Sequence, residues 1–108
     1  MITNDITDKD LGVFKMFAWH YPKKFKVWVN GKELQPGKSL SIPNGKVEVD
    51  YAYEWRWPGN VRAGKKRVLY KTVPDHHNYN IVFKDWIKGP NRIGITNAKQ
   101  ISQERDIQ

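Results

Sequence analysis

The sequence predicts an all-β protein, and three features carry that prediction: alternating apolar residues, frequent turn signals and almost no helical periodicity. Roughly seven short apolar or alternating segments follow one another, and clusters of Gly, Pro and Asn separate them. A chain of 108 residues is long enough for one hydrophobic core. The expected architecture is therefore a small antiparallel β-sandwich or barrel in a single domain.

The first predicted strands are separated by recognisable turns. In residues 12–20 both alternating sets are largely apolar, a pattern typical of a strand covered on both sides. Residues 23–29 alternate more cleanly and end at Asn30 and Gly31, a dipeptide that favours the tight turn of a hairpin. A short strand at 40–42 follows between two further turns that contain Pro and Gly.

The clearest alternation runs from Lys46 to Trp57. Valine, tyrosine and tryptophan occupy one face of this predicted strand, and mainly charged residues occupy the other. The valine and tyrosine end of the apolar face is expected to be core. The pattern breaks at 58–60, which predicts a long hairpin with a flexible tip at 61–66 and a return strand at 67–73.

The C-terminal part is expected to add two strands and a polar tail. Residues 78–87 alternate as a strand does, and 92–98 read as a short last strand. The tail at 98–108 is polar and is expected to be a frayed helix or a disordered end. The predicted organisation is an N-terminal extension at 1–11, a single β domain at 12–97 and this tail.

The run VNGKELQPGKSLSIPNGKVEVDY, from Val29 to Tyr51, resembles bacterial immunoglobulin-like modules. The shared features are strands joined by Asn-Gly and Pro-Gly turns, which many β domains need. The resemblance therefore implies a fold that is immunoglobulin-like in general architecture, and it implies no function and no site residues.

The chain is basic, and the charge is concentrated in its body. Lys and Arg number 19 against 11 for Asp and Glu, which gives a formal net charge of +8. The two ends, 1–10 and 99–108, together hold three Lys or Arg and five Asp or Glu, so the body between them carries +10. Such a charge attracts nucleic acid, an acidic protein or anionic lipid, although it would also serve solubility alone.

Six cations fall within the sixteen residues from Arg56 to Lys71, with no acidic residue among them. Trp55 and Trp57 stand at the base of the same predicted hairpin, where a ring can be half buried with one face free. Cations neutralise phosphates and exposed rings stack on unpaired bases, so this combination is typical of a nucleic-acid-binding surface. The predicted anion-binding site consists of Trp55, Arg56, Trp57, Arg62, Lys65, Lys66, Arg67 and Lys71.

These features predict a non-catalytic binding domain whose basic, aromatic-flanked hairpin binds an anionic partner, above all RNA or DNA. The alternative is a protein-interaction module, such as an inhibitor, an immunity-type protein or an assembly subunit. It would bind an acidic protein through the same surface or through an open sheet edge. Both functions need the same charge, so the sequence does not separate them.

Other functions lack the residues they need. Without cysteine there is no disulfide, no thiolate metal site and no cysteine nucleophile. The motifs of serine hydrolases, phosphate-binding loops and zinc proteases are absent, so no enzymatic activity and no cofactor are expected. His20, Asp75, His76 and His77 offer too few convergent ligands to predict a metal site. The sequence has neither a long apolar span nor a visible export signal, which predicts a cytoplasmic location.

Overall fold

Every residue that the structure describes belongs to a β-strand or to a connection between strands, which confirms the all-β prediction. The computed structural model describes residues 1–7, 22–57, 60–73, 75–84 and 91–107, and only the backbone of 22–24, 55–57 and 60–62. None of these residues lies in a helix that could span a membrane. The strands are β1 (Ile2–Asn4), β2 (Pro22–Val29), β3 (Lys32–Glu33), β4 (Ser39–Leu40), β5 (Lys46–Trp57), β6 (Asn60–Thr72), β7 (Tyr79–Phe83), β8 (Ile93–Ile95), β9 (Ala98–Gln100) and β10 (Arg105–Ile107).

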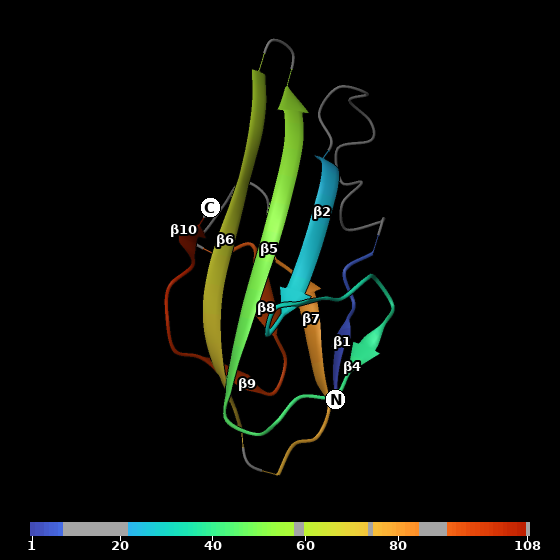
Figure 1. Ribbon diagram of the computed structural model, residues 1–108, viewed down its shortest axis with the longest axis vertical. Helices are drawn as coiled ribbons and strands as arrows, with labels where there is room; N and C mark the ends of the chain where they lie inside the picture. The colour runs from blue at the N-terminus through green and yellow to red at the C-terminus, as the bar shows by residue number, and fades with distance from the viewer. Residues whose placement is uncertain (8–21, 58–59, 74, 85–90, 108) are drawn as a thin grey trace.

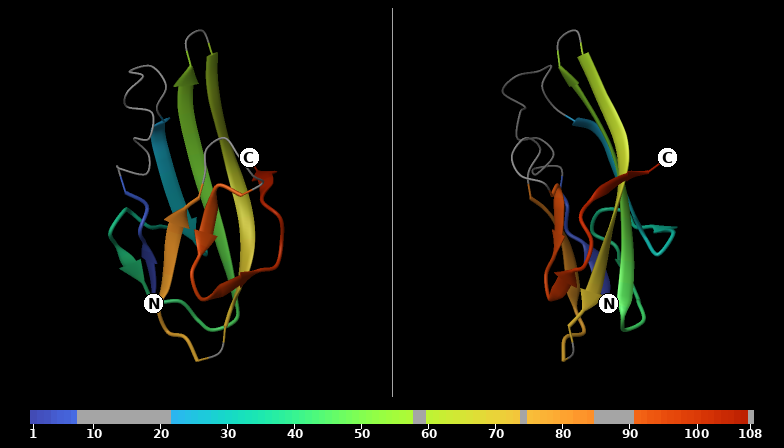
Figure 2. Two further views of the ribbon diagram at one scale, coloured as in Figure 1. Left: turned by 180° about the vertical axis from the view of Figure 1, so that it is seen from behind. Right: turned by 90° about the vertical axis from the view of Figure 1, so that its left-hand side faces the viewer.

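The strands form two sheets that face each other as an open sandwich (Figures 1 and 2). One sheet has four strands in the order β4-β1-β7-β8. The other has six, in the order β10-β6-β5-β2-β3, with β9 also paired to β6. The long strands β5 and β6 extend beyond the end of the four-stranded sheet (Figure 2). One pair, β1 with β7, is parallel, which corrects the expectation of antiparallel pairing throughout, because β1 and β7 are not joined by a hairpin.

The turn predicted at Asn30 and Gly31 is present. β2 and β3 pair across it, and the two residues have φ values of 49° and 86°. Asn and Gly adopt positive φ at the lowest cost, so this dipeptide selects the tight hairpin. Gly45, with a φ of 121°, turns the chain into β5, which begins at Lys46 as predicted.

β6 begins at Asn60, earlier than predicted, and pairs with β5 along the whole hairpin. The flexible tip predicted at 61–66 is therefore wrong, because these residues continue the strand. Gly64, which suggested a tip, has a packing role instead. A Cβ atom added there would lie 2.8 Å from the hydroxyl oxygen of Tyr53 on β5. The glycine makes room for an aromatic ring on the neighbouring strand.

The core lies between the sheets and is built from alternate residues of their facing sides. The valine and tyrosine end of β5 faces it, as predicted, since Val47, Val49 and Tyr51 are at most 1% exposed. Ring contacts continue from there: Phe25 stacks on Tyr51 with centroids 5.4 Å apart and meets Phe83 edge-on at 5.9 Å. The other buried apolar side chains are Ile2, Ile6, Val27, Val29, Leu34, Val68, Tyr70, Tyr79, Ile81, Ile93 and Ile95.

The N-terminal segment contributes to this core, although the sequence predicted an extension at 1–11. β1 lies between β4 and β7, and Ile2 and Ile6 are buried. Asn4 is also buried, and its side chain donates to the carbonyl of Leu34 at 2.8 Å and accepts from the backbone N–H of Ile6 at 3.0 Å. The alternation of Ile2, Asn4 and Ile6 is a strand pattern that the neighbouring polar residues obscured.

The C-terminal tail forms β9 and β10, which corrects the prediction of a helix or a disordered end. Polar side chains fasten it to the body. The Glu104 carboxylate accepts hydrogen bonds from the Tyr51 hydroxyl and from the backbone N–H groups of Arg92, at 3.0 Å, and Ile93, at 3.3 Å. Ser102 accepts from the N–H of Leu69 at 2.9 Å. A polar tail can thus be ordered without an apolar face of its own.

The strand predicted at 12–20 lies outside the described residues, as do residues 85–87 of the strand predicted at 78–87. The described part of that second strand, β7, pairs with β8 with Ile81 opposite Ile95.

Replacing Glu104 by alanine is expected to lower the free energy of unfolding by about 2–3 kcal/mol, because a buried hydroxyl and two N–H groups lose their acceptor. Urea unfolding followed by tryptophan fluorescence measures the loss. Glu33→Ala is the control, since Glu33 is exposed on β3, and it should change stability by less than about 0.5 kcal/mol. Equal losses in the two variants would contradict the role assigned to Glu104.

The fold should lose stability at high pH. Burial raises the pKa of Tyr51, with the hydrogen bond to Glu104 adding to the effect, and burial also raises the pKa of Tyr70. Above about pH 10 an unfolded tyrosine loses its proton, whereas these two keep theirs in the folded state. The unfolded state then binds fewer protons, so stability falls with rising pH by up to about 1.4 kcal/mol per pH unit for each phenol.

Ultraviolet titration of the phenols checks this expectation. Tyr51 and Tyr70, two of the five tyrosines, should stay protonated until the protein unfolds. In the variant Tyr70→Phe, only Tyr51 should show this delayed ionisation. Ionisation of all five phenols while circular dichroism still reports a folded protein would contradict it.

Candidate anion-binding surface

The far end of the hairpin holds four of the predicted site residues. Trp55, Arg56 and Trp57 end β5, and the register places Trp55 opposite Arg62 of β6. Their side chains lie outside the described part of the structure. The free faces of the two tryptophan rings therefore stay a prediction from the sequence. The same holds for the contacts of the Arg56 and Arg62 guanidinium groups.

The other four site residues are divided between the two faces of β6. Lys65, Arg67 and Lys71 lie on the outer face of the six-stranded sheet, which points away from the core. Lys66 lies on the opposite side, the side of the buried residues of β6, because successive residues of a strand point in opposite directions. Its Nζ is 3.4 Å from Oδ1 of Asp106 on β10. The structure does not bring these four cations together into one cluster.

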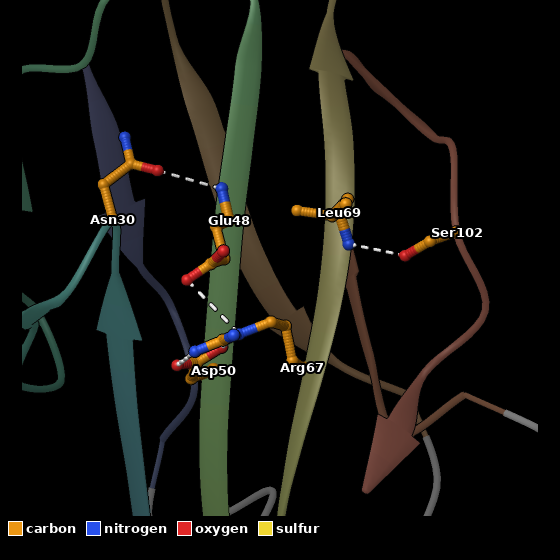
Figure 3. A network of polar contacts seen from close by, with 6 residues as sticks. All are labelled: Asn30, Glu48, Asp50, Arg67, Leu69 and Ser102. Carbon is orange, nitrogen blue, oxygen red and sulfur yellow. Dashed lines mark hydrogen bonds and ion pairs between the residues drawn. The ribbon is translucent and has the colours of Figure 1, made fainter. Parts of the chain in front are cut away.

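Arg67 is bound by carboxylates of the neighbouring strand (Figure 3). Its Nε and Nη2 donate to the two oxygens of Asp50 at 2.8 and 3.0 Å, and Nε lies 3.3 Å from Oε1 of Glu48. Asp50 is only 6% exposed. The hydrogen bond to Asp50 raises the pKa of Arg67, which stays charged. The Arg67 guanidinium therefore links β5 to β6. Nε and Nη2, the two donors that a bidentate contact with a ligand would use, are already bonded to Asp50.

Lys65 lies over an aromatic ring that the sequence analysis did not include in the site. Its Nζ is 4.4 Å from the centroid of the Trp28 ring, a cation–π contact. Trp28 is half-buried on the outer face and stands opposite Asp50 in the register of β2 with β5. The signal was present in the sequence, because Trp28 follows Lys24 and Lys26 in the polar set of alternate residues.

Lys71 belongs to a row of three lysines at the other end of the sheet. Lys71 stands opposite Lys46 of β5 on one side and opposite Lys99 of β9 on the other. All three are exposed, and no carboxylate of the described residues lies within ion-pair distance of any of them. Like charges directly opposite on neighbouring strands repel each other. We call these three residues the lysine row.

The lysine row could not be found from the sequence. Lys46 and Glu48 are neighbours on the charged face of the alternating segment, a pattern typical of ordinary ion pairs on a solvent face. The structure places Glu48 beside Arg67 instead. Lys99 lies in the tail that was expected outside the β domain, and only the pairing of β9 with β6 brings it beside Lys71.

The described residues contain no group of three His, Asp or Glu side chains that could hold a metal ion. His76 and His77 are exposed in the connection before β7, and the carbonyl of His76 accepts a hydrogen bond from the hydroxyl of Tyr79. Comparisons with models of protein families, with curated proteins and with solved structures find no match to this chain.

Arg67→Met is expected to lower the midpoint of thermal unfolding by several degrees, because it leaves the buried carboxylate of Asp50 without its cation. The double variant Asp50→Ala/Arg67→Met should recover part of the loss, since it removes both charges. Circular dichroism melting curves compare them. Arg105→Met is the control on exposed β10 and should melt as the parent does. A double variant that melts lower than Arg67→Met would contradict the pairing.

Proposed function

We propose that this domain is a non-catalytic binding module for an anionic partner, and that the partner is nucleic acid, RNA or DNA. The observation that carries the proposal is the lysine row: three exposed lysines stand opposite one another on adjacent strands, and no carboxylate of the described residues pairs with them. The body of the chain, with a net charge of +10 by sequence, adds attraction over a longer range.

The proposed interaction is mainly with the phosphate backbone. Lysine ammonium groups are compact point charges that bind phosphate oxygens without reading the base sequence. Each contact releases counterions, so binding depends steeply on salt. Lys65, on the same face, adds a further positive charge beside Trp28. Trp55 and Trp57, at the end of β5, are the proposed stacking partners for unpaired bases.

Two of the sequence-predicted cations have a different role in this proposal. Arg67 and Lys66 contribute to the positive field, but their charged groups are held by Asp50 and Asp106. A variant that reverses them would disturb the sheet as well as the surface. We also propose an immunoglobulin-like architecture and a cytoplasmic location, and both rest on the sequence alone.

Fluorescence polarisation with labelled single-stranded and duplex oligonucleotides tests the proposal. Lys46→Gln/Lys71→Gln should weaken binding and reduce the slope of log affinity against log salt by about 2, one for each phosphate contact that is lost. The matched control is Lys32→Gln/Lys38→Gln, which removes two exposed lysines outside the row and the same net charge.

Equal weakening in the two double variants would mean that binding follows total charge, and it would contradict the role of the lysine row. Absence of affinity for every oligonucleotide at low salt, with the protein folded by circular dichroism, would overturn the proposed function.

A further inference from the structure

The outer face of the six-stranded sheet is divided by charge. Residues opposite each other on neighbouring strands lie on one face, so the register assigns each side chain to the inner or the outer face. Among the described residues, β6, β9 and β10 contribute no acid to the outer face, and their cations there are Lys65, Arg67, Lys71, Lys99 and Arg105. The acids of this face stand on β3 and β5, and they are Glu33, Glu48, Asp50 and Glu54. Positive charge therefore follows β6, and negative charge lies to one side of it.

Arg105 on β10 extends the positive charge from the lysine row along β6. It stands opposite Arg67, which lies four residues, or about 13 Å, along β6 from Lys71. Arg105 is exposed, and no carboxylate of the described residues lies within ion-pair distance of it. Arg67 already binds Asp50, so Arg105 supplies the guanidinium that a ligand can use at this level of the sheet.

Lys65 and Trp28 lie further along the same face. Lys65 is two residues from Arg67, and its side chain passes over β5 to place Nζ 4.4 Å from the centroid of the Trp28 ring. The residue of β5 opposite Lys65 is Ala52, whose methyl group leaves room for the lysine stem. We call the lysine row, Arg105 and Lys65 the cationic track. From Lys71 to Lys65 it covers six residues of β6, about 20 Å.

Trp28 adds a group that contacts with phosphate do not need. Its ring is half-buried on the outer face, the face of the lysine row. An aromatic ring can stack on an unpaired base, whereas the bases of a duplex are already paired and stacked on each other. The ammonium group of Lys65 lies over this ring in the free protein. A cation–π contact at an exposed site is weaker than the stacking of a base, and a phosphate would give the displaced ammonium group a new partner.

We propose that the nucleic acid bound by this domain is single-stranded, that its phosphates follow the cationic track, and that an unpaired base stacks on Trp28. The inference rests on the proposed function and names the class of nucleic acid. A track of about 20 Å corresponds to a site of about four or more nucleotides. The acids on β3 and β5 repel a phosphate backbone that leaves the track, which favours a path along β6.

Fluorescence polarisation with a labelled oligodeoxythymidine of about ten nucleotides, and with its duplex with the complementary strand, tests the inference. At one salt concentration the single strand should bind about tenfold more tightly than the duplex. Trp28→Leu should weaken binding of the single strand by about tenfold and change binding of the duplex by less than about twofold. Trp28→Phe keeps an aromatic ring and should lose much less. Circular dichroism checks that both variants are folded.

Arg105→Gln tests the path of the strand separately, at an exposed residue outside the core. It should reduce the slope of log affinity against log salt for the single strand by about 0.7–1, because one phosphate contact is lost. The matched control is Lys84→Gln, which removes the same charge from an exposed residue directly after β7, in the other sheet. The control should leave the slope unchanged. Equal changes in the two variants would mean that binding follows total charge, and they would overturn the proposed path.

The outcomes separate this inference from the proposed function. If the single strand and the duplex bind equally well, or if Trp28→Leu weakens both alike, the domain binds nucleic acid through phosphates only. The inference is then overturned and the proposed function stands. Absence of affinity for both oligonucleotides overturns the proposed function itself, and the inference with it.

Discussion

The pairing register of β5 with β6 is the constraint on which the rest of the structure depends. Side chains alternate along a strand, so a shift of one residue would turn Tyr51 to solvent and Asp50 into the core. The register is favoured from both faces, because Val49 meets Val68 on the inner side and Asp50 meets Arg67 on the outer side. The same register sets Lys46 opposite Lys71. The exposed charge of the outer face is thus a consequence of how the core is packed.

Elements that depend on neighbouring residues could be predicted from the sequence, and those that depend on distant partners could not. The alternation of β5 and the turn at Asn30 and Gly31 are local, and both lie where expected. Gly64 was misread as part of a tip because its reason is the Tyr53 ring on the next strand. The polar tail was expected to be a frayed helix or a disordered end because its anchor, Glu104, finds its donors far back in the chain.

The charge of the candidate surface could be predicted, but not which cations remain free. A guanidinium counted from sequence as available is bound when a carboxylate stands opposite it, as Asp50 stands opposite Arg67. Conversely, Lys99 became part of the surface only because a tail expected outside the domain forms a strand beside Lys71. Composition fixes the total charge, whereas strand register distributes it. The composition of the site therefore depends on the pairing of strands that are distant in sequence.

The seam between the two sheets shows how an open sandwich deals with its edge strands. At Ile93 the edge is closed by Tyr70 from one sheet and by Glu104 from the tail, so both backbone groups are satisfied within the chain. After Ile95 the chain crosses from one sheet to the other through a hydrogen-bonded turn at Thr96 and Asn97. Open strand edges invite pairing with another chain, and proteins commonly protect them with lysines. Here the stem of Lys84 lies across Gly94 of β8, so an exposed ammonium group stands beside this edge strand and opposes its pairing with another basic chain.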